Sequence, residues 1–193
     1  MATETTLRSL FLDELKDAYH AEKQLLKALP KLAKAATSAQ LRQALQSHLA
    51  ETEEHVSRLE QAFEMIDEPV KAKPCAGMAG IIEEGADLIK EEDKGAALDA
   101  GIIAGGQRAE HYEMAAYGTL IAWAKALGHD DVASLLAKTL NEEKAADAKL
   151  TKLAEAGINE ASKSGAEDEG DEGDEDETDP QASGKMRSAS GRR

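Results

Sequence analysis

The chain has 193 residues, and its 38 acidic residues outnumber its 23 basic ones, which gives a formal charge of −15 at pH 7. This charge excludes a nucleic-acid footprint over the body of the protein, because phosphate binding needs clustered Lys and Arg with little opposing charge. Aromatic residues make up only 3% of the chain, while Ala, Leu, Glu and Lys dominate, a composition typical of long helices. The sequence therefore predicts an all-α protein whose natural small partners are cations.

The chain carries one cysteine, Cys75, which excludes an intramolecular disulfide framework and fits a reducing compartment. Residues 1–12 lack the basic start and apolar stretch of a secretory signal, and no run approaches the roughly 18 apolar residues of a membrane span. We therefore expect a cytoplasmic protein without membrane contact, in which Cys75 is a half-buried thiol in a connection.

Two helical patterns occupy the first part of the chain. Apolar residues recur every three or four positions from about residue 4 to 36, and Pro30 inside this pattern predicts a kink or a loosened turn. Thr37 or Ser38 can cap a second helix with the same spacing, which runs to about residue 66. The short turn between the two predicts a helical hairpin.

A connection separates this hairpin from a second one. Residues 67–80 hold prolines, glycines and the cysteine, and a short amphipathic helix follows from Gly80 to Glu92. Two further helices are predicted from about residue 94 to 127, ending at Gly128, and from about residue 130 to 157.

The chain from residue 159 onward has no apolar periodicity. Ten of the thirteen residues from 167 to 179 are acidic, and four basic residues lie near the end of the chain. Such a segment cannot bury enough surface to offset its ordering entropy. We expect a folded domain over residues 1–158 and a disordered acidic tail with a basic end over residues 159–193.

Shifting the sequence against itself by 91 residues aligns the two hairpins. Glu22 then coincides with Glu113 and Leu29 with Leu120, among other matches. One hairpin cannot bury its own apolar stripe and must pack against its sister, unless the match is a chance coincidence of two heptad-like patterns. The repeat predicts a four-helix bundle with one long crossover that carries a short extra helix.

Three glutamates occupy positions where these patterns call for apolar residues. At about 100° of rotation per residue, Glu22, Glu113 and Glu143 each lie on the apolar stripe of a different helix. An ionised carboxylate in an apolar interior costs several kcal/mol unless it is paired or binds a metal. Since no Lys or Arg falls on these inner faces, a shared cation is the expected partner.

Further ligands are predicted at the same depth of the bundle. The second helix supplies Glu51 on the flank of its stripe, with His48 and His55 on the same flank, and the fourth helix supplies Asp147. Oxygen-rich ligands with few nitrogens favour iron or manganese over zinc. The predicted metal ligands are Glu22, Glu51, His55, Glu113, Glu143 and Asp147, with His48 and Glu110 as further candidates.

Four segments carry a family resemblance: DAYHAEKQLLKALPKLAKAA, HLAETEEHVSRLEQAF, EHYEMAAYGTLIAWAKALG and TLNEEKAADAKL. They resemble the YciE/YciF family of ferritin-like stress proteins, over roughly residues 7–157. The resemblance implies a ferritin-like, rubrerythrin-related bundle, usually dimeric, with a dinuclear metal motif and a ferroxidase or stress-protective role.

In ferritin-like carboxylate proteins two helices give one Glu each and the other two give a Glu-x-x-His motif. The resemblance places Glu22 and Glu113 at the single positions and Glu51 and Glu143 at the bridging ones. The sequence departs from this pattern, because it contains no Glu-x-x-His; a histidine and an aspartate come four residues after the bridging glutamates instead.

Two functions follow as hypotheses. The first is a di-metal enzyme, a ferroxidase that binds two iron ions (or manganese) and uses oxygen or peroxide, with Tyr19 or Tyr117 near the site. The second is a non-enzymatic, stress-induced homodimeric scaffold with a degenerate metal site, whose acidic tail contacts a basic partner. A storage cage is not expected.

Overall fold

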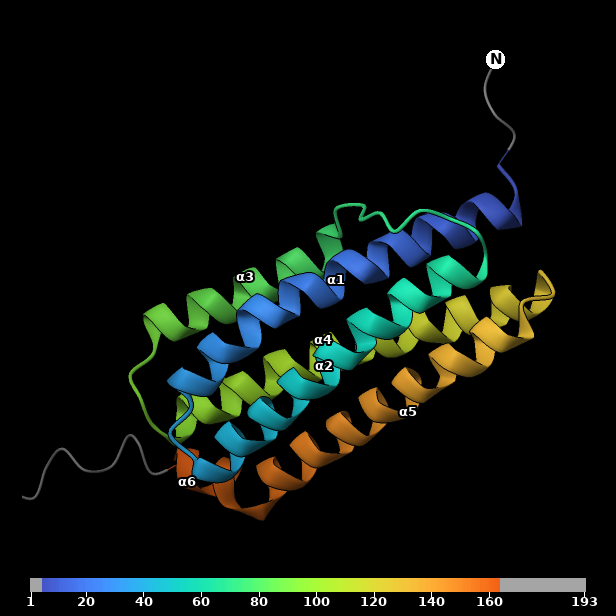
Figure 1. Ribbon diagram of the computed structural model, residues 1–193. Helices are drawn as coiled ribbons and strands as arrows, with labels where there is room; N and C mark the ends of the chain where they lie inside the picture. Colours follow the sequence, from blue (N-terminus) through green and yellow to red (C-terminus); the bar gives the residue numbers. More distant parts are fainter. Residues whose placement is uncertain (1–4, 164–193) are drawn as a thin grey trace, which may run out of the picture.

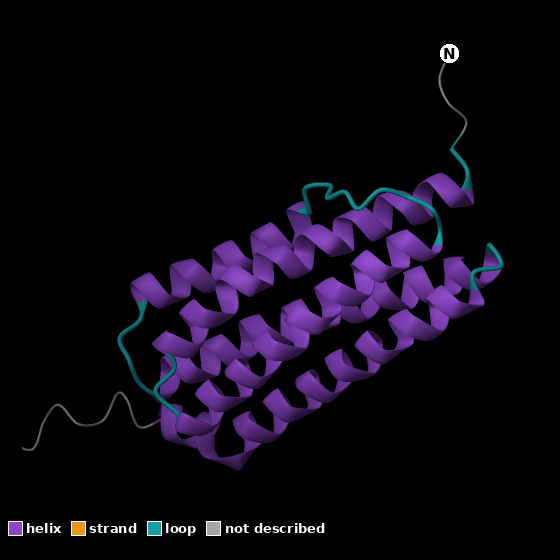
Figure 2. Ribbon diagram, in the orientation of Figure 1, coloured by secondary structure: helices purple, strands orange, loops and turns teal. Residues whose placement is uncertain are grey.

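The structure is a computed structural model that describes residues 5–163. Within that part of the chain it is entirely helical, without strands (Figure 2). The helices are α1 (Leu7–Ala35), α2 (Ala39–Met65), α3 (Ala76–Glu91), α4 (Ala96–Ala126), α5 (Asp130–Leu153), a π-helical turn η1 (Ala154–Ile158) and α6 (Asn159–Ala161).

Four long helices form the bundle that the repeat predicts (Figure 1). Helix α1 packs on α2 and α4 packs on α5, so each hairpin stays intact, and the hairpins meet through the α1–α4 and α2–α5 pairs. Helix α3 runs along the outside against α1 and α4 and connects the hairpins. The predicted all-α four-helix bundle with a helix-bearing crossover is confirmed.

The crossover helix begins earlier than predicted. It starts at Ala76 rather than near Gly80, because the Cys75 Sγ accepts a hydrogen bond from the Met78 amide and caps the first turn. The expectation of a half-buried Cys75 is also corrected, since this residue is only 1% exposed. At the first hairpin, helix α1 continues through Pro30 to Ala35.

A short helix, α6, follows residue 158, where the sequence predicts the end of the folded domain. Helix α6 ends at Ala161, and the predicted acidic tail lies outside the described residues from position 164 onward. Among the described helices, none is long and apolar enough to cross a membrane.

The core consists of two apolar clusters separated by a polar layer. One cluster lies toward the α1–α2 turn and contains Leu25, Leu45 and Ile102, and the other lies toward the opposite end and contains Phe11 and Phe63. Between them the bundle buries polar side chains from all four long helices. Because the apolar clusters hold the helices together on both sides, these polar groups cannot move out to water.

A buried aspartate ties the two hairpins at one end of the bundle. The Asp99 carboxylate, on α4, accepts hydrogen bonds of 2.7 Å from the backbone amides of Thr37 and Ser38 in the α1–α2 turn. Asp99 is only 3% exposed, and the amides belong to the turn that precedes helix α2, so the carboxylate stabilises that helix start.

We expect Asp99→Ala to lower the free energy of unfolding by about 1–3 kcal/mol, because a charged acceptor is lost from two backbone donors. Urea denaturation followed by circular dichroism measures this change. The matched control is Asp93→Ala, at an exposed position just before the same helix, which should shift stability by less than about 0.5 kcal/mol. Equal effects of both substitutions would contradict the assigned role of Asp99.

Candidate metal centre

The polar layer gathers six ionisable side chains from the four long helices. Helix α1 contributes one glutamate, α2 two histidines, α4 two glutamates and α5 one glutamate, and each residue is at most 6% exposed. These residues are Glu22, His48, His55, Glu110, Glu113 and Glu143. Each of the four helices therefore carries a ligand-type side chain where its helical period calls for an apolar one.

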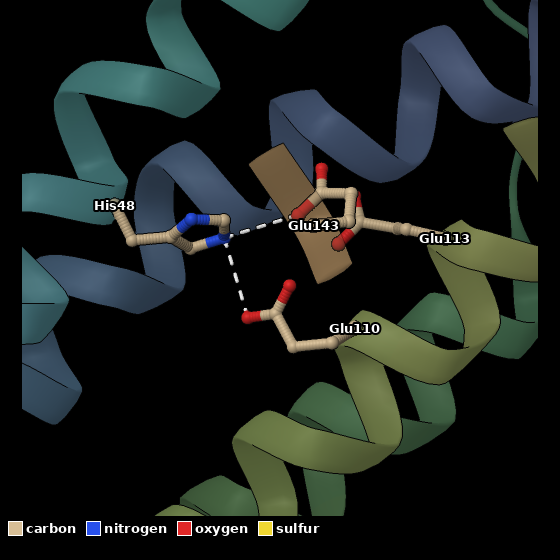
Figure 3. Close-up of side chains that lie close together, drawn as sticks. All are labelled: His48, Glu110, Glu113 and Glu143. Atoms are coloured by element: carbon tan, nitrogen blue, oxygen red, sulfur yellow. Dashed lines mark ion pairs between the residues drawn. The ribbon is translucent and has the colours of Figure 1, made fainter. Parts of the chain in front are cut away.

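Their ligand atoms form two groups that share one residue. In the first group the atoms lie within 4.8 Å of one another, and its members are His48, Glu110, Glu113 and Glu143. In the second group the same limit holds for Glu22, His55 and Glu143. Figure 3 shows the first group, in which three carboxylates from α4 and α5 converge beside the His48 imidazole. Glu143 lies between the two groups and could bridge two cations.

The distances between these groups are short for a buried cluster. The His48 Nε2 lies 3.4 Å from Glu110 Oε1 and 3.7 Å from Glu143 Oε2. The His55 Nδ1 lies 3.0 Å from Glu143 Oε1 and 3.4 Å from Glu22 Oε1. Two imidazoles, two turns apart on α2, thus face the same set of carboxylate oxygens.

Several buried polar atoms of this cluster have no hydrogen-bond partner. Among the described residues, seven buried side-chain atoms have no hydrogen-bond partner, and all seven belong to Glu22, His55, Glu110, Glu113 and Glu143. The 3.0 Å approach of His55 to Glu143 is therefore close without the geometry of a hydrogen bond. Buried polar atoms in native proteins almost always have partners, and a cation that accepts their lone pairs would satisfy them. The donor set of carboxylate oxygens and imidazole nitrogens fits such a cation.

A network on one side of the cluster holds His55 in place. Its Nε2 lies 2.9 Å from Glu142 Oε2, and Arg58 donates to both carboxylate oxygens of Glu142 and to Thr139 Oγ1. Because Glu142 engages one ring nitrogen, the other nitrogen faces Glu143 and the centre of the bundle. Partners of this kind orient metal-binding histidines. Arg58 was not among the predicted residues; its only signal was its place one turn after His55.

Glu22 has a partner of its own. The Tyr117 hydroxyl donates a hydrogen bond of 2.5 Å to Glu22 Oε1, and both residues are buried. Tyr117 thus lies at the site, as one of the two tyrosines named for that position. The other, Tyr19, donates to Glu60 Oε1 at 2.7 Å instead.

Two predicted ligands lie outside both groups. Glu51 follows His48 by three residues, so its side chain points about 60° away; its carboxylate is 43% exposed and contacts His48 Nδ1 at 3.2 Å. The Asp147 carboxylate accepts a hydrogen bond from Gln107 Nε2 at 3.1 Å. The structure therefore gives Glu51 the position of a partner to His48, while the two further candidates, His48 and Glu110, lie within the first group.

Burial shifts the proton affinities of the cluster. It raises the pKa of the Glu22 and Glu113 carboxyls and, reinforced by Glu143, raises the pKa of Glu110 to about 11. Burial by itself would lower the pKa of His55, but the Glu143 and Glu22 carboxylates raise it to about 10. For Glu143 burial is outweighed by its contact with His55, so its pKa is lowered. An ion pair between His55 and Glu143 is thus surrounded by carboxyls that hold their protons to unusually high pH.

The fold and the site together define a class: a four-helix bundle of two hairpins joined by a long crossover, with buried carboxylates and histidines at its centre that could hold a metal. Residues 6–163 match the family model described as "Domain of unknown function (DUF892)", and the chain belongs to this family. The resemblance to YciE/YciF proteins that the sequence indicated is confirmed.

Three comparisons illustrate the relationship. Protein YciF of Escherichia coli (strain K12) is 44% identical over 156 residues, which cover 80% of this chain and 94% of the relative. The crystal structure of the E. coli stress protein YciF matches with a TM-score of 0.78 and 43% identity, covering 81% of this chain and 99% of that one. A Rhodopseudomonas palustris protein called YcfI, described as a candidate structural protein, matches with a TM-score of 0.75 and 44% identity, covering 78% and 97%.

We expect the affinity for Mn²⁺ to fall as the pH drops from 8 to 6. The raised pKa values mean that a cation must displace protons from Glu22, Glu110, Glu113 or His55. Each displaced proton makes binding about tenfold weaker for every unit by which the pH falls. Isothermal titration calorimetry in buffers of different ionisation enthalpy measures both the affinity and the protons released. A Glu113→Gln variant should release fewer protons, and an affinity independent of pH would contradict this account.

Proposed function

We propose that the protein is a di-metal carboxylate protein that binds two iron ions, or manganese, and acts as a ferroxidase with a protective role in stress. The observation that supports this most strongly is the set of seven buried, partnerless ligand atoms in one cluster. Two bound cations would satisfy these atoms and offset the free-energy cost of burying their charges.

The charges of the cluster agree with two divalent ions. Its four carboxylates carry four negative charges when ionised, which balance two doubly charged cations, and two neutral imidazoles complete the donors. Glu143 is the only member of both groups, so it is the proposed bridge. Oxygen donors outnumber nitrogen donors and the cluster contains no thiolate, which favours iron or manganese over zinc.

In the proposed reaction iron is the substrate. Two ferrous ions lose one electron each, and one hydrogen peroxide accepts both electrons with two protons and leaves as two water molecules; with oxygen as the acceptor the product is hydrogen peroxide. The residues of this chain hold the ions together, exclude bulk water, and keep Glu22 in position through the Tyr117 hydroxyl. The Arg58–Glu142 pair holds the His55 ring.

The stress role is carried over from the E. coli relative, whose structure is described as that of a stress protein. Two further expectations from the sequence stand as part of this proposal: a cytoplasmic location and a homodimer.

We expect the protein to oxidise anaerobically supplied Fe²⁺ on addition of oxygen or peroxide, monitored by the ultraviolet absorbance of ferric iron. A Glu22→Ala/Glu113→Ala variant should be slower by roughly a hundredfold, because removing ligands costs at least as much as removing the partners that orient them. The matched control, Glu53→Ala/Glu64→Ala, changes two exposed glutamates of α2 and should oxidise iron like the wild type. If wild type and the ligand variant react equally fast, the ferroxidase proposal is wrong.

A second candidate function is that of a non-enzymatic scaffold with a degenerate metal site. The description of the R. palustris relative as a candidate structural protein favours it, and so does the position of Glu51 and Asp147 outside both ligand groups. The two functions differ in whether the folded protein binds metal tightly.

We expect Mn²⁺ or anaerobic Fe²⁺ to raise the thermal unfolding midpoint, because a ligand bound only by the folded state stabilises it by about 2.7 kcal/mol at a hundred times its dissociation constant. Differential scanning calorimetry measures the midpoint with and without metal. The Glu113→Gln variant should lose this stabilisation, whereas the exposed control Glu53→Gln should keep it. Identical midpoints for the wild type with and without metal would favour the scaffold.

A further inference from the structure

The half of the bundle next to the α1–α2 turn contains a cavity beside the metal centre. Its volume is about 330 Å³, within the range of small-molecule binding sites. The four long helices and the crossover helix α3 all contribute to its walls, which include Leu25 and Leu29 on α1, Leu45 on α2 and Leu150 on α5. His48 and Glu110 form the part of the wall that faces the ligand cluster.

The cavity exists because small residues stand where the opposite half of the bundle has large ones. Its lining includes Ala28, Ala44, Gly105, Gly106 and Ala109. The other apolar half is filled instead by Phe, Tyr, Trp and Leu side chains packed against one another. Since native cores are normally filled to crystal-like density, an apolar space of this size indicates a position for a ligand.

Helix α3 lies against α1 and α4 on the outside of the bundle (Figure 1), and its residues form one wall of this cavity. Its Ile81, Ile82 and Ile89 line the cavity and are only partly buried. No Phe, Tyr or Trp occurs among the described residues that line it, so an aromatic ligand would find no stacking partner. The walls suit a flexible aliphatic chain.

The charged residues of the lining divide by burial. Lys27 and Lys31, one turn apart on α1, and Lys149 on α5 are exposed and mark openings of the cavity. Glu51 is partly exposed and also lines it, so three lysines outnumber one carboxylate among the lining residues that reach solvent, whereas His48 and Glu110 are buried. In a chain with a net charge of −15, lysines at an apolar opening favour an anionic head group. Lysine stems also extend the apolar wall to the surface.

We propose that this cavity binds a free fatty-acid anion of medium chain length, with its carboxylate at the lysines and its aliphatic chain in the apolar interior. The site is distinct from the cation positions and goes beyond the proposed function, because none of its walls except His48 and Glu110 belongs to the ligand cluster.

Isothermal titration of the full-length protein with octanoate, decanoate and dodecanoate, below their micelle concentrations, tests the proposal. Each buried methylene contributes roughly a factor of four to binding, and successive acids differ by two methylenes. Affinity should therefore rise about fifteenfold from one acid to the next until the cavity is full. The same series is measured after removal of metal with a chelator and should be unchanged. An absence of binding, or an affinity independent of chain length, would overturn the proposal.

A cavity-filling variant provides the structural test. A Cβ placed on Gly105 would meet no atom within 4 Å, so Gly105→Leu should fill the cavity without a clash and weaken decanoate binding at least about tenfold. The matched control is Gly118→Leu on the same helix, which also has open space around its Cβ but lies outside the cavity. Both variants should melt no lower than wild type, since Gly is unfavourable inside a helix. Equal binding by both variants would contradict the assigned site.

Head-group recognition has its own control. Lys27→Ala/Lys31→Ala should weaken decanoate binding about threefold, the scale of exposed charge pairs, and leave binding of uncharged decanol unchanged. Equal weakening of both ligands would refute a carboxylate at these lysines. Binding that appears only with added Mn²⁺ would place the carboxylate on the metal and would also overturn the assignment, while leaving the test of iron oxidation untouched.

Discussion

Four buried carboxylates and two buried imidazoles across the middle of one bundle are the constraint around which this protein is built. An apolar layer at this height would stabilise the isolated bundle better, because buried charges and partnerless polar atoms each cost free energy. The two apolar clusters on either side supply enough burial to hold the helices in place despite that cost. Outside the layer, the Arg58–Glu142 pair and the Tyr117 hydroxyl fix particular ligands without neutralising the whole cluster. A pair of bound cations would offset the free-energy cost of burying this layer.

The 91-residue repeat accounts for some of the buried polar residues of the site, whereas others have no counterpart of the same kind in the other hairpin. Glu22 and Glu113 are related by the 91-residue shift and face each other from the two hairpins. The same shift relates Glu143 to Thr52, whose hydroxyl donates to the backbone carbonyl of His48. A symmetric frame therefore carries an asymmetric set of ligands. One group has three carboxylates and one imidazole and the other has two carboxylates and one imidazole, so the two groups differ in the donors that they would offer a cation.

The two ends of the bundle are packed differently. Large side chains such as Phe11, Phe63 and Tyr117 fill the end toward the N-terminus and fix the helices there. Toward the α1–α2 turn, alanines and glycines leave a space that helix α3 covers, and the Asp99 carboxylate ties the turn to α4. The crossover therefore both connects the two hairpins and forms one wall of the cavity beside the candidate metal centre.

The sequence by itself determined the helices, their pairing into two hairpins, and the inward direction of Glu22, Glu113 and Glu143. These features follow from the 3.6-residue period and the repeat, both of which are local or can be read along one chain. Only the tertiary structure decided which other polar residues join them. The packing of neighbouring helices buries His48 and Glu110 but leaves the Glu51 side chain 43% exposed. The Arg58–Glu142 contact and the cavity likewise depend on residues brought together from separate helices, which spacing along one helix cannot report.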